Sequence, residues 1–172
     1  YENARSRTET AERSYVPALQ ALIEMAHANP GEFKCAISLS GCAIEQLENH
    51  APQCIELLQE LNDTGCVEFL AEPYSHGFSS LINEETFRDE VTRLCQKVKS
   101  LFGQEPKIFR NSCLIYSDDI GELVASMGFK GMLAEGAKHV LGWKSPHFVY
   151  NCCRDPRLKL LLRDYSLSED IS

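Results

Sequence analysis

Two short polar clusters in this sequence bring together side chains that could do acid–base or nucleophilic chemistry. The first is EPYSHG (72–77), which contains Tyr74 and His76 and directly follows an apolar run. The second is RNSC (110–113), which follows the apolar pair Ile108-Phe109. In α/β proteins, polar side chains that follow parallel strands meet at one edge of the sheet, where chemistry usually takes place. We therefore expect the two clusters to share a pocket.

Strands and helices that could position these clusters alternate along the chain. Apolar runs of strand length are followed by polar loops and by segments with helical periodicity. The predicted strands are 33–39, 66–70, 108–109, 129–133 and 158–162, and the predicted helices are 15–28, 43–49, 52–62, 84–102 and 118–127, with a loop over 141–150. This alternation predicts a parallel α/β architecture, and the length fits a single domain over residues 1–172.

Composition argues against several classes of protein. A net charge of -8 without a long basic run argues against a nucleic-acid partner. No run approaches the roughly twenty apolar residues of a membrane span, and the N-terminal stretch has no signal-peptide pattern. The eight cysteines fall mostly in apolar patterns, which predicts free thiols and a reducing, cytoplasmic compartment. No ligand spacing typical of zinc is present, so we predict neither a metal nor another cofactor.

Three blocks of the sequence resemble the amylase-like members of glycoside hydrolase family 57, in the same order. They are GCVEFLAEPYSHGFSSL, FGQEPKIFRNSCLIYSDDIGELVASMGFKGMLAEGAKHVLGWKSP and LKLLLRDYSLSEDIS. The resemblance implies an incomplete (β/α)7 barrel of the glycoside hydrolase/deacetylase type, of which the chain covers only part. It also implies hydrolysis or transfer of α-1,4-glucans by a retaining mechanism. By position, it implies that Glu68, Tyr74 and His76 contact or support the substrate.

The resemblance aligns the catalytic nucleophile of the family with Cys113, where a glutamate would be expected. Retaining hydrolysis needs one carboxylate to attack the sugar and a second carboxyl group about 5 to 5.5 Å away to protonate the leaving oxygen. A thiol has a shorter side chain and is mainly protonated at neutral pH. The acid/base aspartate of the family lies downstream of the block matched by LSEDIS. We therefore expect turnover by this chain to be impaired.

Several of these residues also have purely structural interpretations. Glu68 could be a surface strand residue, but an acid between two apolar neighbours favours a functional role. His76 alone fits a hydrogen-bonded structural histidine equally well. On chain properties alone, Cys113 is most simply a buried thiol.

Other polar and aromatic residues remain open between two roles. Arg110 and Asn111 could bond loop carbonyls or sugar hydroxyls. Glu135 follows the next predicted strand and is an alternative carboxylate for the pocket. Trp143 and Tyr150 could stack on sugar rings or anchor the packing of their loop.

Charged residues near two helix or chain ends need no chemistry to explain them. Asp118 and Asp119 lie at a helix N-terminus, where the helix dipole stabilises them. Asp164, Glu169 and Asp170 are interpreted as solvated charges.

Two other functions compete with catalysis by a family 57 domain. A non-catalytic relative could bind carbohydrate or a protein partner with the inherited groove, which the cysteine at position 113 favours. A metal-dependent polysaccharide deacetylase on a related barrel would need an aspartate and two histidines as ligands. The five histidines show no i, i+4 pair, which disfavours that reading.

Overall fold

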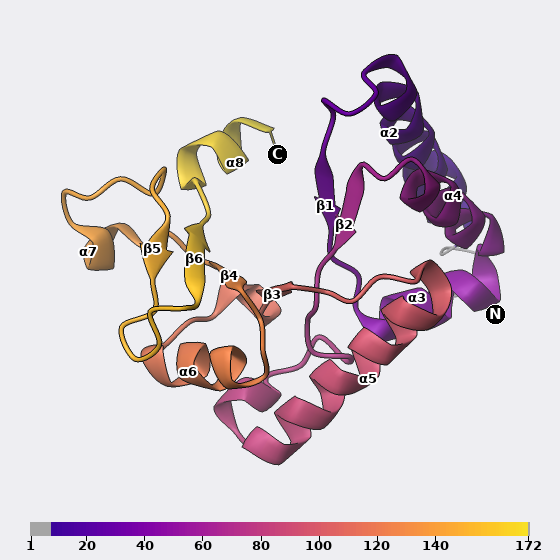
Figure 1. Cartoon of the computed structure of the whole chain (residues 1–172). Coiled ribbons are helices and arrows are strands. Elements are labelled where there is room, and N and C mark those ends of the chain that lie inside the picture. Colours follow the sequence, from indigo (N-terminus) through magenta and orange to yellow (C-terminus); the bar gives the residue numbers. More distant parts are fainter. Residues whose placement is uncertain (1–7, 172) are drawn as a thin grey trace.

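A curved row of parallel strands carries α2, α4, α5 and α6 on its convex side in the computed structural model, which describes residues 8–171 (Figure 1). The strands are β1 (Cys35–Ile37), β2 (Val67–Phe69), β3 (Ile108–Arg110), β4 (Gly131–Ala134), β5 (Tyr150–Asn151) and β6 (Lys159–Leu162). The helices and helical turns are η1 (Ala11–Tyr15), α2 (Val16–Ala28), α3 (Gly41–His50), α4 (Pro52–Asp63), η2 (Ser79–Leu81), α5 (Glu84–Phe102), η3 (Ser112–Leu114), α6 (Asp118–Ser126), α7 (Lys138–Leu141) and α8 (Tyr165–Ile171).

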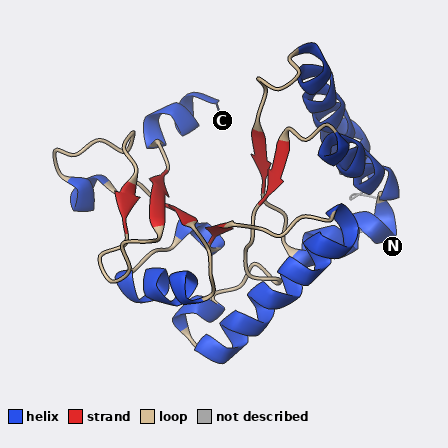
Figure 2. Ribbon diagram, viewed as in Figure 1, coloured by secondary structure: helices blue, strands red, loops and turns tan. Residues whose placement is uncertain are grey.

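The parallel strands lie side by side in chain order. β1 pairs with β2, and β3 pairs with β4, which pairs with β6. A parallel bridge between Ala71 and Phe109 joins the two groups, since the chain after β2 continues alongside β3. The short β5 adds to β6 in the antiparallel direction. The result is an arc of β/α units (Figure 2), which confirms the predicted parallel α/β architecture.

Caps predicted from the sequence set the helix ends. The Asn83 side chain accepts a hydrogen bond from the Thr86 backbone at 2.8 Å, and the Ser117 hydroxyl accepts one from the Ile120 backbone at 3.2 Å. Gly103 ends α5 with a φ of +70°, a conformation that glycine adopts without strain. These caps determine where α5 and α6 begin and where α5 ends before the chain enters β3.

Phenylalanines on β2 and β3 fix which face of the arc meets the helices. Phe69 stacks on Phe102 of α5 with ring centroids 4.0 Å apart, and Phe109 contacts Phe87 of α5 at 5.6 Å. Side chains alternate along a strand, so the neighbours Glu68 and Arg110 lie on the opposite, concave face. The helices therefore leave that face free for polar groups.

The five predicted parallel strands are confirmed, with bounds that differ from the predicted ones by up to two residues at each end. The plain loop predicted over 141–150 is wrong in part, because Tyr150–Asn151 pairs with β6. The helices α7 and α8 were also not predicted. The lengths of α7, β5 and α8 are four, two and seven residues, which are too few for a periodic pattern to show.

The eight cysteines are free thiols, of which Cys113 and Cys153 are exposed. No helix within residues 8–171 is both long enough and apolar enough to cross a bilayer.

Candidate functional site

A buried carboxylate, Glu72, joins polar groups from three consecutive strands. It follows β2, and its side chain is 2% exposed. One oxygen, Oε2, accepts a hydrogen bond from the Ser38 hydroxyl, just after β1, and lies 3.4 Å from Arg110 Nη1 at the end of β3. The other, Oε1, lies 2.9 Å from His76 Nδ1. The carboxyl ends of β1, β2 and β3 thus meet at one charged centre, which we call the Glu72 cluster.

The partners of Glu72 point part of their polar surface toward solvent. The His76 and Arg110 side chains are 41% and 31% exposed, in contrast to the carboxylate between them. A carboxylate accepts hydrogen bonds, so Nδ1 of His76 is the protonated nitrogen when the ring is neutral, and Nε2 is then an acceptor. The cluster therefore offers a ligand one imidazole nitrogen and part of a guanidinium, and the Glu72 carboxylate holds both groups in place.

The loops at this edge hold the non-glycine residues with positive φ within residues 8–171. These are His76 at 55°, Cys113 at 52° and Leu114 at 55°. Such conformations cost of order 1–3 kcal/mol each and cluster at ligand sites. The Cys113 side chain is exposed, so the interpretation of this residue as a buried thiol is wrong.

Asn111 holds the loop that carries Cys113. Its side chain is buried and donates to Ser80 Oγ and to the Ile115 carbonyl, each at 3.0 Å. Its Oδ1 accepts from the Ser112 backbone at 3.0 Å. Of the two roles considered for Asn111, these contacts favour bonding to its own loop.

Glu135 lies beside the Cys113 loop. Its backbone N–H donates to the Leu114 carbonyl at 3.2 Å, so the end of β4 touches η3. Its carboxylate faces Arg163 Nη1, just after β6, at 3.5 Å. Both side chains are partly exposed. The backbone contact between Glu135 and Leu114 therefore brings a carboxylate residue of the predicted site next to the loop that carries Cys113.

Glu68 and Tyr74 lie on opposite sides of the sheet. Glu68 is exposed on the concave face, within β2 and below the edge where Glu72 lies. The Tyr74 ring is buried, its hydroxyl donates to Glu45 on α3, and Arg93 of α5 stacks 3.8 Å from its centre. Burial, and then the bond to Glu45, raise the pKa of Tyr74. These contacts favour a packing role for Tyr74 over contact with a substrate.

Trp143 is 92% exposed in the loop between α7 and β5. Since β5 runs antiparallel to β6, this loop reaches β5 from the carboxyl end of β6, the same edge as the Glu72 cluster. Within residues 8–171, no three His, Cys, Asp or Glu side chains are grouped to hold a metal ion.

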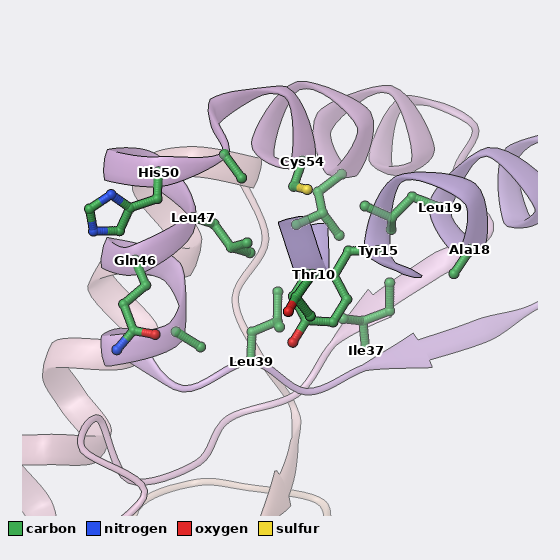
Figure 3. Close-up of a pocket in the computed structure, with 13 residues that line it drawn as sticks. Thr10, Tyr15, Ala18, Leu19, Ile37, Leu39, Gln46, Leu47, His50 and Cys54 are labelled. Atoms are coloured by element: carbon green, nitrogen blue, oxygen red, sulfur yellow. The ribbon is translucent and has the colours of Figure 1, made fainter. Parts of the chain in front are cut away.

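A cavity lies elsewhere, between the helices and β1 (Figure 3). It measures about 360 Å³, and its walls are mainly apolar side chains such as Leu19, Leu47 and Leu58. It contains none of the predicted site residues. We interpret it as a packing gap in the helical layer beside β1.

Ser38 and Glu72 are site residues that sequence reasoning did not single out. The signal for Glu72 was available, because Glu72 and His76 are four residues apart in one polar cluster after a strand. Ser38 had no such signal, since only the pairing of β1 with β2 brings it to Glu72.

The fold and this edge define a parallel β/α-barrel protein with a polar site at the carboxyl ends of its strands. The sequence pattern of Glycosyl hydrolase family 57 matches residues 2–172. The chain belongs to this family. A Methanocaldococcus jannaschii protein that carries the provisional name alpha-amylase is 34% identical over 162 residues, which cover 94% of this chain and 34% of that protein.

Solved structures share the fold at lower sequence identity. The 4-alpha-glucanotransferase from Thermococcus litoralis is similar with a TM-score of 0.81 and 17% identity over 98% of this chain and 26% of that one. The second structure is a Mycobacterium smegmatis protein with the provisional name polysaccharide deacetylase. Its TM-score is 0.66 and its identity 17%, over 94% of this chain and 50% of that protein. The chain therefore has part of an incomplete (β/α)7 barrel and spans about a third of the length of the curated relative.

Proposed function

We propose that this chain forms the glucan-binding edge of a family 57 α-1,4-glucan hydrolase or transferase in which turnover is impaired at Cys113. Family membership supports the substrate class, together with the alpha-amylase and 4-alpha-glucanotransferase names of its relatives. The Glu72 cluster supports binding, because a fixed imidazole and guanidinium suit sugar hydroxyls.

The observation that carries the proposal is the exposed thiol of Cys113 at the carboxyl end of β3. The family resemblance implies a nucleophilic carboxylate at this position, which supports the proposal. A retaining mechanism needs that carboxylate to form the glycosyl bond while a second carboxyl group protonates the leaving oxygen. The cysteine side chain is shorter than that of glutamate and carries no carboxylate oxygen. Binding at this edge then remains while the first chemical step is slowed.

Cys113→Glu in the longest available form of the protein tests the proposal. We expect the variant to release reducing sugar from maltoheptaose at least tenfold faster than the wild type, because a carboxylate restores the nucleophile. Cys153→Glu is the matched control, since Cys153 is also an exposed free cysteine and lies outside the site. Wild-type hydrolysis as fast as that of the Cys113→Glu variant would refute the impairment.

The alternative function is a non-catalytic relative that binds carbohydrate or a protein partner, and the same cysteine favours it. The two differ in one outcome of the experiment. If Cys113→Glu binds maltoheptaose but gains no hydrolysis, the rest of the catalytic machinery is absent and the alternative holds. We also propose that the protein works in the reducing cytoplasm, which its eight free thiols support.

A further inference from the structure

One carboxylate on α5, that of Glu90, ties down the segment that carries His76. Its Oε1 accepts a hydrogen bond from the Ser75 hydroxyl, and its Oε2 accepts one from the Ser79 hydroxyl at 2.8 Å. Ser75 directly precedes His76, and Ser79 follows it by three residues. The two bonds therefore close residues 75–79 against the helix, and we call this segment the His76 loop.

The backbone of the His76 loop needs such support. His76 has a φ of 55°, a conformation that a residue other than glycine keeps only where its surroundings hold it. Its N–H donates to the Pro73 carbonyl at 2.9 Å, which fixes the turn before the loop. A Cβ on Gly77 would lie 3.0 Å from Ser75 Oγ, so a side chain there would press on the hydroxyl that reaches Glu90. The placement of the imidazole therefore depends on the loop as well as on Glu72.

Helix α5 is a rigid support for both ends of the loop. Arg93 follows Glu90 by three residues, so the two side chains lie on one face of the helix. The Arg93 guanidinium lies 3.8 Å from the centre of the Tyr74 ring, directly before the loop. The helix thus holds residues 74, 75 and 79, while the His76 side chain between them stays 41% exposed.

We propose that Glu90 is a positioning residue for His76, which keeps the imidazole on Glu72 and leaves Nε2 available to a sugar hydroxyl. The inference rests on the proposed function, since it concerns the same binding edge. Glu90 acts through the two serine hydroxyls, so its effect on a ligand passes through the loop. Hydroxyls both donate and accept hydrogen bonds, so a glutamine at position 90 can keep both contacts without the charge.

Glu90→Ala and Glu90→Gln test this inference in the full chain. We would determine the Kd for maltoheptaose by calorimetry. Glu90→Ala should weaken binding roughly five- to tenfold, which corresponds to the loss of about one hydrogen bond to the sugar. Glu90→Gln should stay within about twofold of the wild type. The double variant Ser75→Ala/Ser79→Ala should reproduce the loss in Glu90→Ala, and it leaves the helix unchanged.

The nitrogen chemical shifts of the ¹⁵N-labelled His76 ring report its position without any sugar. At a pH where the ring is neutral, the wild type should show the form protonated on Nδ1, because Glu72 accepts that proton. Glu90→Ala should shift the ring toward the form protonated on Nε2, and Glu90→Gln should restore the wild-type spectrum.

Glu84→Ala is the matched control, because Glu84 is an exposed glutamate of the same helix that pairs with Arg88 at 2.9 Å. It should change neither the Kd nor the ring shifts. Unchanged ring shifts in Glu90→Ala overturn the positioning role, as does an unchanged Kd where the wild type binds. Equal losses in Glu90→Gln and Glu90→Ala also overturn it, since charge would then matter and not the loop. If the wild type does not bind maltoheptaose, the proposed function fails, and the ring shifts still decide whether Glu90 positions His76.

Discussion

Glu72 is the residue whose removal should most disturb the candidate site. Its carboxylate is 2% exposed and contacts Ser38, His76 and Arg110, so Glu72→Ala leaves three polar groups without their shared partner. A hydrogen bond to a charged group contributes about 1.5–3 kcal/mol, and breaking a buried ion pair costs about 3–5 kcal/mol. Water reaches His76 and Arg110, and the cost of burying the carboxylate disappears. We therefore expect Glu72→Ala to lower the free energy of unfolding by about 2–4 kcal/mol.

Glu72→Gln separates the charge from the shape. The amide keeps the length and one acceptor oxygen, so we expect a smaller loss of about 1–2 kcal/mol. Urea unfolding followed by circular dichroism measures both, since a slope of about 2 kcal/mol/M moves the midpoint for Glu72→Ala by about 1–2 M. Nitrogen chemical shifts of the His76 ring should also change in both variants, because the partner of Nδ1 is altered.

A surface ion pair provides the control for Glu72. Glu105 pairs with Lys99 at 2.5 Å, but both side chains are largely exposed, so Glu105→Ala should leave the urea midpoint unchanged. The view that Glu72 organises the edge would be refuted if Glu72→Ala unfolded at the same urea concentration as the wild type. It would also be refuted if Glu72→Gln lost more free energy of unfolding than Glu72→Ala.

Two further predictions follow from exposure and from protonation. Iodoacetamide should modify the exposed Cys113 and Cys153 before Cys35 and Cys95, because burial raises the pKa of each of the latter thiols to about 11. Mass spectrometry of the labelled protein measures this order. Fast labelling of Cys95 before Cys113 would contradict the placement of η3. Asp164 is not the solvated charge expected from the sequence, because its carboxylate pairs with His147 and accepts the Leu167 backbone N–H. The Leu167 bond, and then His147, lower the pKa of Asp164, which means that the folded state binds this proton less readily, so its stabilisation is present above the ordinary pKa of about 3.9 and is lost as pH falls through the lowered value. Amide signals of α8 should therefore shift as the pH falls below about 4 in the wild type and not in Asp164→Asn. Equal shifts in both proteins would rule out a role for the hydrogen bond from the Leu167 backbone to the Asp164 carboxylate.

Local signals in the sequence were enough to predict the parallel strands and the main helices. Apolar runs, caps such as Asn83 and stop signals such as Gly103 act over a few residues, and the structure follows them. The short elements β5 and α7 depend on pairing or packing with distant parts of the chain. Their residues carry no period of their own, so the sequence could not show them.

The candidate site divides in the same way. Its position at the carboxyl ends of the strands follows from the parallel architecture, and His76 and Arg110 lie together there as expected. The predicted roles of Glu68, Cys113, Glu135 and Trp143 remain predictions. Apart from the Glu72–His76 pair, the partners could not be read from spacing, because they come from distant parts of the chain. Ser38 is 34 residues from Glu72, and His147 is 17 residues from Asp164.

The arrangement of the edge supports our proposal that binding persists when position 113 carries no nucleophilic carboxylate. None of the contacts of Glu72 with Ser38, His76 and Arg110 involves the side chain at position 113. The Cys113 loop is instead held by Asn111 through bonds to backbone and to Ser80. Replacing a glutamate by cysteine at position 113 therefore removes a reacting group without removing support from the groups beside it. On this reasoning, Cys113→Glu and Glu72→Gln should change the free energy of unfolding additively, within about 0.5 kcal/mol. A larger coupling would mean that position 113 belongs to the same network, and that its exchange altered binding as well as turnover.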